Sequence, residues 1–327
     1  MTTTTRPTYS ATDHIQTIGF GLEIETTGLS RERVAQAIQS VVGGTLGFEY
    51  SYSRHTVTAP DGRKWSACSD ASINGDGAEF VTPALRYSDM DTLQNVIRAI
   101  RRAGARVDTS CGVHVHVDAS SPSGVSTAAE LKKLAKLVYS NEELLILSLD
   151  VEERVRPNYR RSWCRPTNEN FVARVARRNS ANTVDGVVAD YYATTGATAG
   201  LPESSRHRYD DSRYQILNLH AIRRHGTVEF RLFNATLHAG KIKSYIQLVL
   251  AMAAKAKTGR HTAAKKRALD PNRTRYAMRS LMLRLGMSGD EFKTARLHLV
   301  TKARRLTGHT AFGTEASESR GRNNGAE

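Results

Sequence analysis

The stretch CGVHVHVD, residues Cys111–Asp118, places two histidines on either side of a valine in an otherwise apolar run. In a strand, residues i and i+2 point to the same face of the sheet. His114 and His116 are therefore predicted to share one face of a strand, and the three valines of the stretch to share the other. Such a segment constrains the fold strongly, because one face of its sheet must be buried while the other presents two imidazoles.

Three other segments are predicted to be strands of the same kind, each with a polar pair on one face and apolar residues on the other: Glu23-Ile24-Glu25, Asn218-Leu219-His220 and Glu229-Phe230-Arg231. An ordinary half-exposed sheet carries mostly Thr, Lys, Ser or Gln at its outward positions. Here these positions hold carboxylates and histidines, which are groups that bind cations. Two glutamates on one face repel each other, and their burial costs several kcal/mol unless a cation compensates.

A divalent metal ion accounts for these groups most economically. Carboxylate oxygens with an occasional imidazole, completed by nucleotide phosphates, suit Mg²⁺ or Mn²⁺. Asp70 and Glu79 supply two more carboxylates across a Gly-containing turn in CSDASINGDGAEFVTP. Each motif alone has a structural alternative: a solvated strand face for E-x-E, a hydrogen-bonded core histidine for H-x-H and a cross-strand ion pair for E-x-R. If the chain had no metal site, all of these structural alternatives would have to hold in it together.

The order of the motifs along the chain resembles that of the amidoligase family. The elements that carry the resemblance are FGLEIE, D-x-S followed by G-x-E-F-V-T-P, GVHVH, WCRP, and LNLHAI with HGTVEFRLFNATL. The likeness runs from about Gly19 to Ala253. This family belongs to the carboxylate–amine ligases with a glutamine synthetase-like fold. The resemblance therefore implies an α+β fold: an antiparallel sheet curved into a half-barrel, with helices on its outer face and a helical C-terminal extension.

The resemblance also implies ATP and two or three Mg²⁺ or Mn²⁺ ions on the concave face of the sheet. The residues that match ligands of the metal bridging the nucleotide phosphates are Glu23, His114 and Glu229. Those that match ligands of the metal facing the acyl substrate are Glu25, Asp70 and Glu79, although glutamine synthetases use Glu in place of the aspartate. His116 is expected to lie against the nucleotide, and Arg231 to meet the transferred phosphoryl group.

Other polar residues are weaker candidates. Arg161 and Arg165 lie in RSWCRP, a segment that in this family contributes arginines near the phosphates, and the alternative for both is surface charge. Asn218 and His220 share the polar face by strand parity, so that Asn218 is expected beside the nucleotide; the alternative is hydrogen bonding to neighbouring strands. Three further arginines are interpreted as lying at the surface or where the substrate enters: Arg154, Arg156 and Arg160.

The chemistry of such a ligase explains these residue types. A carboxylate is a poor acyl donor because its oxygen is a poor leaving group. ATP converts it to an acyl phosphate, which an amine attacks to give an amide, ADP and phosphate. Negative charge builds on the phosphoryl oxygens during the transfer, so metal ions and arginines stabilise the transition state. No side-chain nucleophile is needed, and the sequence has neither a G-x-S-x-G elbow nor a glycine-rich phosphate-binding loop.

Composition narrows the class of protein further. The chain of 327 residues has a formal net charge of +15, which favours polyanionic partners such as nucleotides or nucleic acid. No apolar run approaches the ~18 residues of a membrane helix, and the N-terminus lacks a hydrophobic signal core. Three widely spaced cysteines indicate reduced thiols. We expect a cytoplasmic protein without membrane contact; members of the family also occur in phage genomes, so a phage origin stays open.

Four units are predicted along the chain: a flexible tail (1–14), a catalytic domain (15–258), a basic helical extension (259–308) and a second flexible tail (309–327). Helices are expected after Ser30, from about Asp89, after Thr127 and from about His238. Residues 152–178 are expected to be irregular, residues 179–213 to form a long loop or lid, and residues 214–221 to form a strand. A capping box, Ser288-x-x-Glu291, is expected to open the last helix.

The basic extension is the most strongly charged part of the chain. From Lys255 to Arg305, fifteen basic residues stand against three acidic ones, a net charge of +12. A solvated surface is the ordinary reading of such charge, and weak contact with nucleic acid or another polyanion is the alternative. One helix face is expected to pack on the catalytic domain, namely Met278, Leu281, Met282 and Leu285.

The sequence therefore predicts an ATP-dependent ligase that joins the carboxylate of an amino acid such as glutamate to an amine acceptor. Two alternatives belong to other classes. A metal-dependent phosphohydrolase or nuclease would turn over phosphate esters without ATP. A nucleic-acid-binding protein with purely structural acidic pairs would depend on neither metal nor ATP.

Overall fold

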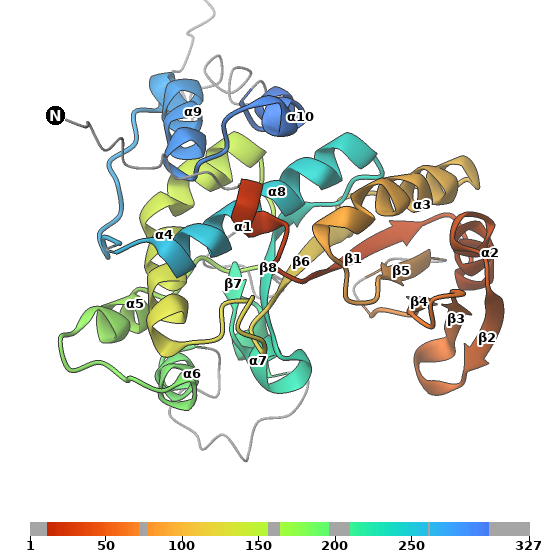
Figure 1. The fold of residues 1–327 in the computed structure, drawn as a ribbon, viewed down its shortest axis with the longest axis horizontal. Coiled ribbons are helices and arrows are strands. Elements are labelled where there is room, and N and C mark those ends of the chain that lie inside the picture. The colour runs from red at the N-terminus through yellow and green to blue at the C-terminus, as the bar shows by residue number, and fades with distance from the viewer. Residues whose placement is uncertain are drawn as a thin grey trace, which may run out of the picture.

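The computed structural model describes residues 12–71, 73, 77–155, 164–195, 210–260 and 262–300. Its centre is an open, antiparallel 8-stranded sheet in the spatial order β2-β3-β4-β5-β1-β6-β8-β7 (Figure 1). The strands are β1 (Phe20–Thr27), β2 (Thr45–Glu49), β3 (Arg54–Thr58), β4 (Lys64–Cys68), β5 (Gly77–Val81), β6 (Gly112–Asp118), β7 (Leu217–Asn218) and β8 (Thr227–Asn234). The histidine strand, β6, lies between β1 and β8, so the segments with polar pairs are neighbours.

Helices connect and cover these strands. They are α1 (Thr12–Ile15), α2 (Arg31–Val42), α3 (Met90–Arg102), α4 (Ala128–Leu149), α5 (Glu169–Ala176), α6 (Val184–Tyr192), α7 (His220–His225), α8 (Ala239–Thr258), α9 (Thr274–Arg284) and α10 (Lys293–Ala295). The helices predicted from apolar periodicity are confirmed. The capping box of α4 forms as expected, because the Thr127 hydroxyl accepts from the Glu130 amide and the Glu130 carboxylate accepts from the Thr127 amide at 3.1 Å.

One face of the sheet is apolar and is covered by helices. Leu22 and Ile24 of β1 are buried there, together with the three valines of β6. α2 packs on β3, β4 and β5, α8 packs on β6, and α3 contacts both helices. α4 then packs on α8, and α9 on α4, which builds the helical part at the upper left of Figure 1. This packing leaves the polar face of the central strands for a functional site.

The strand register decides which side chains share the polar face. Glu23 of β1 pairs with His114 of β6, and His116 pairs with Glu229 of β8. Between Val113 and Val115 the register of β6 against β8 shifts by one residue. Such a bulge bends a strand and re-aims its side chains, and bulges are common beside active sites.

Two segments predicted to be irregular contain helices. Within the loop expected over 179–213, residues 184–192 form α6 and bury four side chains: Val187, Val188, Tyr191 and Tyr192. Within the segment expected to be irregular over 152–178, residues 169–176 form α5, which Asn168 caps. Both helices pack on α4. They are too short for a strong periodic pattern, so the contact with α4 decides their structure.

The strand predicted over 214–221 is wrong at both ends, because residues 214–216 and 219–221 lie outside β7. Only Leu217 and Asn218 pair with β8, and His220 begins the short helix α7 instead. The Asn218 side-chain oxygen accepts from the His220 amide at 2.8 Å, which turns the chain out of the strand. His220 was expected on the polar face of the sheet because it stands two residues after Asn218. It lies in a helix, so this prediction does not hold.

The predicted capping box at Ser288 is also wrong. The turn at Asp290–Phe292 begins without a side-chain cap, and the Glu291 carboxylate instead accepts from the Tyr87 hydroxyl and pairs with Lys243 at 2.9 Å. The predicted inward face of α9 is confirmed, because its four apolar residues are at most 1% exposed. The predicted tail 309–327 and most of the tail 1–14 lie outside the described residues.

The three cysteines are free and buried, as expected for reduced thiols. In the part of the chain that the structure describes, no helix combines the length and the apolar character needed to span a bilayer.

Candidate active site

The polar face of the central strands brings the predicted glutamates and histidines together. Nδ1 of His114 lies 3.2 Å from Oε2 of Glu23 and 3.5 Å from Oε1 of Glu229. Nε2 of His116 lies 3.5 Å from Oε1 of Glu23. The two imidazoles of β6 thus lie between a carboxylate of β1 and a carboxylate of β8. This geometry follows from the alternation of the three strands and from their register.

A second contact orients each histidine ring. Nη2 of Arg154 lies 3.3 Å from Nε2 of His114. Because an arginine only donates, Nε2 must accept, and the proton of the neutral ring is then on Nδ1, toward Glu23. His116 has its Nδ1 2.9 Å from Oγ1 of Thr227, and its buried Nε2 makes no hydrogen bond to the described residues. In this arrangement Nε2 of His116 can bind a metal directly, whereas Nδ1 of His114 can bind one only after it releases its proton.

Glu229 is the carboxylate held most firmly. One oxygen accepts from Arg231, and the other accepts from the Asn218 side-chain amide at 2.6 Å. The Arg231 guanidinium also lies 5.7 Å from the centre of the Tyr214 ring. Burial alone would raise the pKa of Glu229, but the charges of Arg231 and the two histidines lower it to about 2. Glu229 is therefore ionised at neutral pH, and Arg231 is fixed beside the cluster.

Glu23 and His116 stabilise each other's charge. Burial alone would raise the pKa of Glu23, but His116 and then His114 hold it well below its usual range. Burial alone would lower the pKa of His116, but Glu23 and Glu229 raise it. Protonated His116 thus supplies positive charge at a place where a bound cation would also be stabilised.

A second acidic group adjoins the first one. Glu25 and Glu79 pair directly across β1 and β5, and one Glu25 oxygen accepts from the Gly112 amide. Burial, together with the charges of Glu23, Asp70 and Glu25, raises the pKa of Glu79 well above its usual range. Carboxylates crowded in this way take up protons unless a cation lies among them.

Two sets of ligand atoms in the described chain are close enough to hold a cation, since the atoms of each set lie within 4.8 Å of one another. The first set is Glu23, His116 and Glu229, and the second is Glu23, Glu79 and His114. Glu25 and Asp70, which the sequence also suggests as ligands, belong to neither set. Carboxylates with one imidazole fit Mg²⁺ or Mn²⁺. The raised pKa of Glu79 indicates a place where bound positive charge would relieve repulsion.

Arg154 belongs to the site, which corrects its interpretation as a residue at the surface or the substrate entrance. Its Nε donates to the Arg231 carbonyl at 3.1 Å, and its Nη1 donates to the Cys111 carbonyl at 3.3 Å. Gly112 leaves room for it, because a Cβ there would lie 1.9 Å from Nη2 of Arg154. No pattern in RVRPNYRR singles out this arginine, since its place depends on how the chain turns after α4.

Of the two arginines predicted near the phosphates, Arg161 and Arg165, the structure describes only Arg165. The guanidinium of Arg165 pairs with Asp211 at 3.8 Å rather than with a carboxylate of the cluster. Arg161 lies outside the described residues. The role of both residues in phosphate binding stays a prediction.

A cavity of about 420 Å³ opens beside the cluster. Its lining includes Glu23 and His116, together with Arg86, Asp118 and His225. The His225 ring lies 6.1 Å from the His116 ring and nearly perpendicular to it. This volume falls in the range of small-molecule sites. His225 immediately precedes the GTVEFR motif, but no pattern in the sequence singles it out as a site residue.

A helix-covered antiparallel sheet with a buried cluster of glutamates, histidines and an arginine on its other face defines a candidate active site whose side chains could hold a cation. The chain belongs to the family described as "Putative amidoligase enzyme", whose model matches residues 16–253. This match confirms the family predicted from the order of the motifs. No curated protein matches the chain.

One solved structure, described as "Crystal structure of novel glutamine synthase homolog", is similar to this chain at 12% sequence identity. The similarity covers 90% of this chain and 68% of that chain, with a TM-score of 0.38. A likeness this distant carries no argument about the fold or the chemistry.

Proposed function

We propose that this protein is an ATP- and Mg²⁺-dependent carboxylate–amine ligase that works through an acyl phosphate. The observation that carries the proposal is the cluster in which Glu23, His116 and Glu229 meet beside a fixed arginine. Membership of the amidoligase family supports the reaction class. The proposal includes a glutamine synthetase-like, half-barrel form of the sheet and a catalytic unit over residues 15–258.

The residues present fit divalent cations, with Mg²⁺ or Mn²⁺ as the proposed ions. One set, Glu23, His116 and Glu229, would hold an ion next to the nucleotide, and the other, Glu23, Glu79 and His114, an ion next to the acyl donor. Glu25 and Asp70 stay proposed ligands because their charges act on Glu79. When bound, these ions would neutralise phosphate charge and polarise the phosphoryl oxygens.

The nucleotide is proposed to occupy the cavity that Glu23 and His116 share with Arg86. His116 already has one ring nitrogen fixed by Thr227, so the ring is oriented before a ligand arrives. Asn218 is proposed to act through Glu229, whose carboxylate it positions. Because these contacts already hold the His116 and Glu229 side chains in place, fewer side chains have to become ordered when substrate binds.

Arg231 has the central catalytic role in the proposal. The carboxylate oxygen of the acyl donor attacks the γ-phosphorus of ATP, and the bond from that phosphorus to ADP breaks. Charge that develops on the phosphoryl oxygens would be stabilised by the guanidinium that Glu229 holds in place. The amine nitrogen then attacks the acyl carbon, phosphate leaves, and the nitrogen loses a proton to complete the amide. The proposed donor is an amino acid such as glutamate.

Hydroxylamine can test this function before the natural amine is known, because it traps acyl phosphates as hydroxamates. A panel of amino acids and other carboxylates, with glutamate first, would be incubated with ATP, Mg²⁺ and hydroxylamine. We expect ADP and hydroxamate in equal amounts with at least one donor, and neither product without Mg²⁺. A donor labelled with ¹⁸O in its carboxylate should pass one ¹⁸O atom to the released phosphate.

Two results would contradict the proposal. One is ADP formation that is indifferent to every carboxylate while ¹⁸O never reaches phosphate. The other is Mg²⁺-dependent cleavage of phosphate esters or phosphodiesters without ATP, which would favour the phosphohydrolase alternative.

A further inference from the structure

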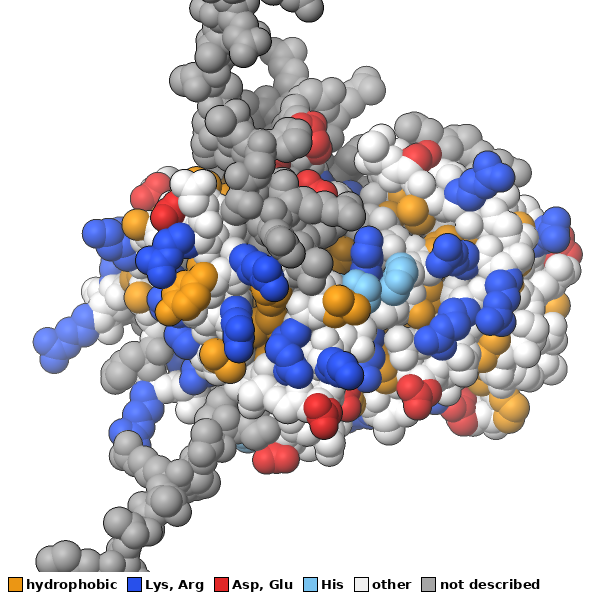
Figure 2. All heavy atoms as spheres, turned by 90° about the horizontal axis from the view of Figure 1, so that it is seen from above, with side chains coloured by type: hydrophobic (Ala, Val, Ile, Leu, Met, Phe, Trp, Pro, Cys, Tyr) orange, Lys and Arg blue, Asp and Glu red, His pale blue; other side chains and the backbone are white. Residues whose placement is uncertain are grey.

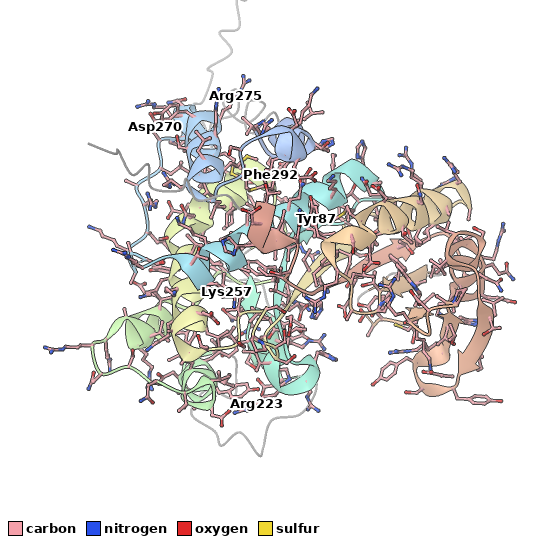
Figure 3. All side chains as sticks on the ribbon, in the orientation of Figure 1. Tyr87, Arg223, Lys257, Asp270, Arg275 and Phe292 are labelled. Carbon is pink, nitrogen blue, oxygen red and sulfur yellow. The ribbon has the colours of Figure 1, made fainter. Side chains whose placement is uncertain are left out.

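The basic extension contains a surface that the proposed reaction does not use. Helix α9 buries its apolar side and carries arginines along both of its exposed flanks. Arg275 and Arg279 are four residues apart and share one flank, whereas Arg273, Tyr276 and Arg284 lie on the other. Figure 3 shows Arg275 projecting from α9 away from the sheet. We use the name α9 surface for this helix and the two cavities beside it.

The first cavity lies between α9 and α4 and has a volume of about 430 Å³. Three of its lining residues are cationic, namely Arg267, Arg273 and Arg284, and one is acidic, Asp270. The Asp270 carboxylate accepts from the Asn272 amide at 2.9 Å and so caps the turn before α9. Burial, and then the charge of Arg267, lowers the pKa of Arg284, so the two guanidinium groups act on each other.

The second cavity lies on the opposite flank of α9 and has a volume of about 550 Å³. Its lining is Arg275, Arg279, Lys293, Thr294, Arg296, Leu297 and Val300, with no acidic residue among them. Glu291, an acidic residue nearby in sequence, instead pairs with Lys243 at 2.9 Å. Among the described residues, positive charge thus exceeds negative charge on both flanks of one helix, and a bound anion would relieve the repulsion.

Aromatic and aliphatic side chains lie among these cations. Tyr276 is 63% exposed, and the Arg273 guanidinium lies 4.9 Å from the centre of its ring. Leu297, in the lining of the second cavity, is 60% exposed. Cations for phosphates combined with an exposed aromatic ring for a base are the features that bind single-stranded nucleic acid. A duplex, whose bases are stacked inside, would leave Tyr276 without a partner.

Figure 2 views the molecule from the side on which α9 and α10 lie, and blue Lys and Arg side chains are spread widely over this face. Lys266, one of the fifteen basic residues of the extension, is already engaged, because it pairs with the buried Glu142 at 3.3 Å and lies over the Tyr139 ring. The basic surface is therefore centred on α9 rather than on Lys266.

We propose that the α9 surface binds single-stranded nucleic acid, with phosphates on the arginines of both flanks and a base on Tyr276. Binding of this kind needs no particular base sequence, since every base offers a face for stacking. Release of counterions from the strand makes the affinity fall steeply as salt rises. This proposal is independent of the ligase reaction, because none of these residues belongs to the cluster on the sheet.

The test is fluorescence anisotropy with labelled oligo-dT and oligo-U of about twenty nucleotides, spanning more than one site size, and with a duplex of equal length. Each is titrated with protein at several salt concentrations. The main variant is Arg275→Gln/Arg279→Gln/Arg284→Gln, and its matched control is Arg98→Gln/Arg101→Gln/Arg102→Gln on α3. Both variants remove three positive charges from exposed positions of one helix. Tyr276→Ala is matched by Tyr50→Ala, since Tyr50 is 93% exposed.

We expect single strands to bind more tightly than the duplex. Each lost phosphate contact should make the slope of log K against log salt shallower by about 0.7, so the α9 variant should differ from wild type by about 2. The α3 control should keep the wild-type slope. Tyr276→Ala should weaken binding by about tenfold and Tyr50→Ala should not. Equal affinities for oligo-dT and oligo-U would show that the protein recognises phosphates and bases. A higher affinity for oligo-U would show that it also recognises the ribose hydroxyl.

Several results would overturn the proposal. Absence of binding at low salt is one, and an equal loss of affinity in the α9 variant and the α3 control is another. Equal affinity for duplex and single strand, with no effect of Tyr276→Ala, would also contradict it. Displacement of the oligonucleotide by polyglutamate at equal charge concentration would assign the surface to acidic peptides instead. Unfolding curves of all variants should match wild type, because the changed side chains are exposed.

Discussion

Nδ1 of His114 and Oε2 of Glu23 lie 3.2 Å apart across two strands that pair in register. A slip of one residue between these strands would turn both histidines of β6 to the helix-covered face and its valines to the polar face. The valines are fully buried, so the hydrophobic effect opposes such a slip. The same alternation therefore specifies the core and positions the candidate site.

The first prediction concerns Arg231. Arg231→Ala should lower kcat for ADP formation by about a hundredfold or more while changing the Kd of ATP much less, because the guanidinium meets charge that develops during transfer. Glu229→Gln should weaken Mn²⁺ binding itself and leave the buried Arg231 without its charged partner. Steady-state kinetics and calorimetric titration of Mn²⁺ separate the two effects.

The control for both variants is Arg223→Ala, which removes an arginine that pairs with Asp185 at the surface. This variant should keep the wild-type kcat. Wild-type ADP formation by both Arg231→Ala and Glu229→Gln, with a working donor, would rule out the proposed mechanism.

The second prediction concerns Arg154 as a positioning residue. Gly112→Ala should displace its guanidinium, because the added Cβ would lie 1.9 Å from Nη2. Gly112→Ala and Arg154→Met should each lower kcat by about ten- to a hundredfold, as changes behind a ligating histidine often do. Both should also shift the pH profile of kcat, since the contact that places the His114 proton on Nδ1 is lost. An unchanged profile in both variants, or an equal loss in the surface variant Arg98→Met, would contradict this role.

The third prediction is a pH dependence of stability from His220. This side chain is 4% exposed and has its Nδ1 2.8 Å from the Tyr192 hydroxyl. Burial lowers the pKa of His220 to about 4, whereas an unfolded histidine titrates near pH ~6.5. The unfolded chain therefore binds the proton first, and this group's contribution to stability is present above about pH 6.5 and is lost as pH falls toward 4.

Urea unfolding at several pH values checks this. Wild type should lose on the order of 3 kcal/mol more than His220→Gln between pH ~7 and ~4, at about 1.4 kcal/mol for each unit of pKa difference. Identical pH dependence in the two proteins would show that His220 does not titrate as burial requires.

Much of the sheet and most of the candidate cluster could be predicted from the sequence. Strand alternation fixes which residues share a face, so the polar pairs of β1, β6 and β8 could be placed on one face before any contact was known. The grouping of Glu23, His114 and Glu229 as ligands came from the resemblance to the family, and the structure places His116 in the set with Glu23 and Glu229. Local hydrogen bonds likewise predict the starts of α2 and α4 at Ser30 and Thr127. These features depend on residues a few positions apart.

Features that depend on distant contacts could not be predicted. Arg154 enters the site because Gly112, from another element, leaves space for it. The strand expected after Tyr214 ends early because the Asn218 side chain bonds the His220 amide and starts α7. Helix α6 forms because α4 offers a surface for its apolar residues. In each case a tertiary contact decides between alternatives that the local sequence allows.

The most direct test of the account is the anomalous diffraction of Mn²⁺ in crystals grown with a non-hydrolysable ATP analogue. The ligase proposal needs the cations and the phosphates at one place on the sheet. We predict a Mn²⁺ ion within ~2.0–2.6 Å of a carboxylate oxygen of Glu23 and of Glu229, with an imidazole nitrogen of His116 or His114 and a phosphate oxygen completing its shell. Mn²⁺ and the nucleotide bound elsewhere, with Glu229 still held only by Arg231 and Asn218, would contradict it.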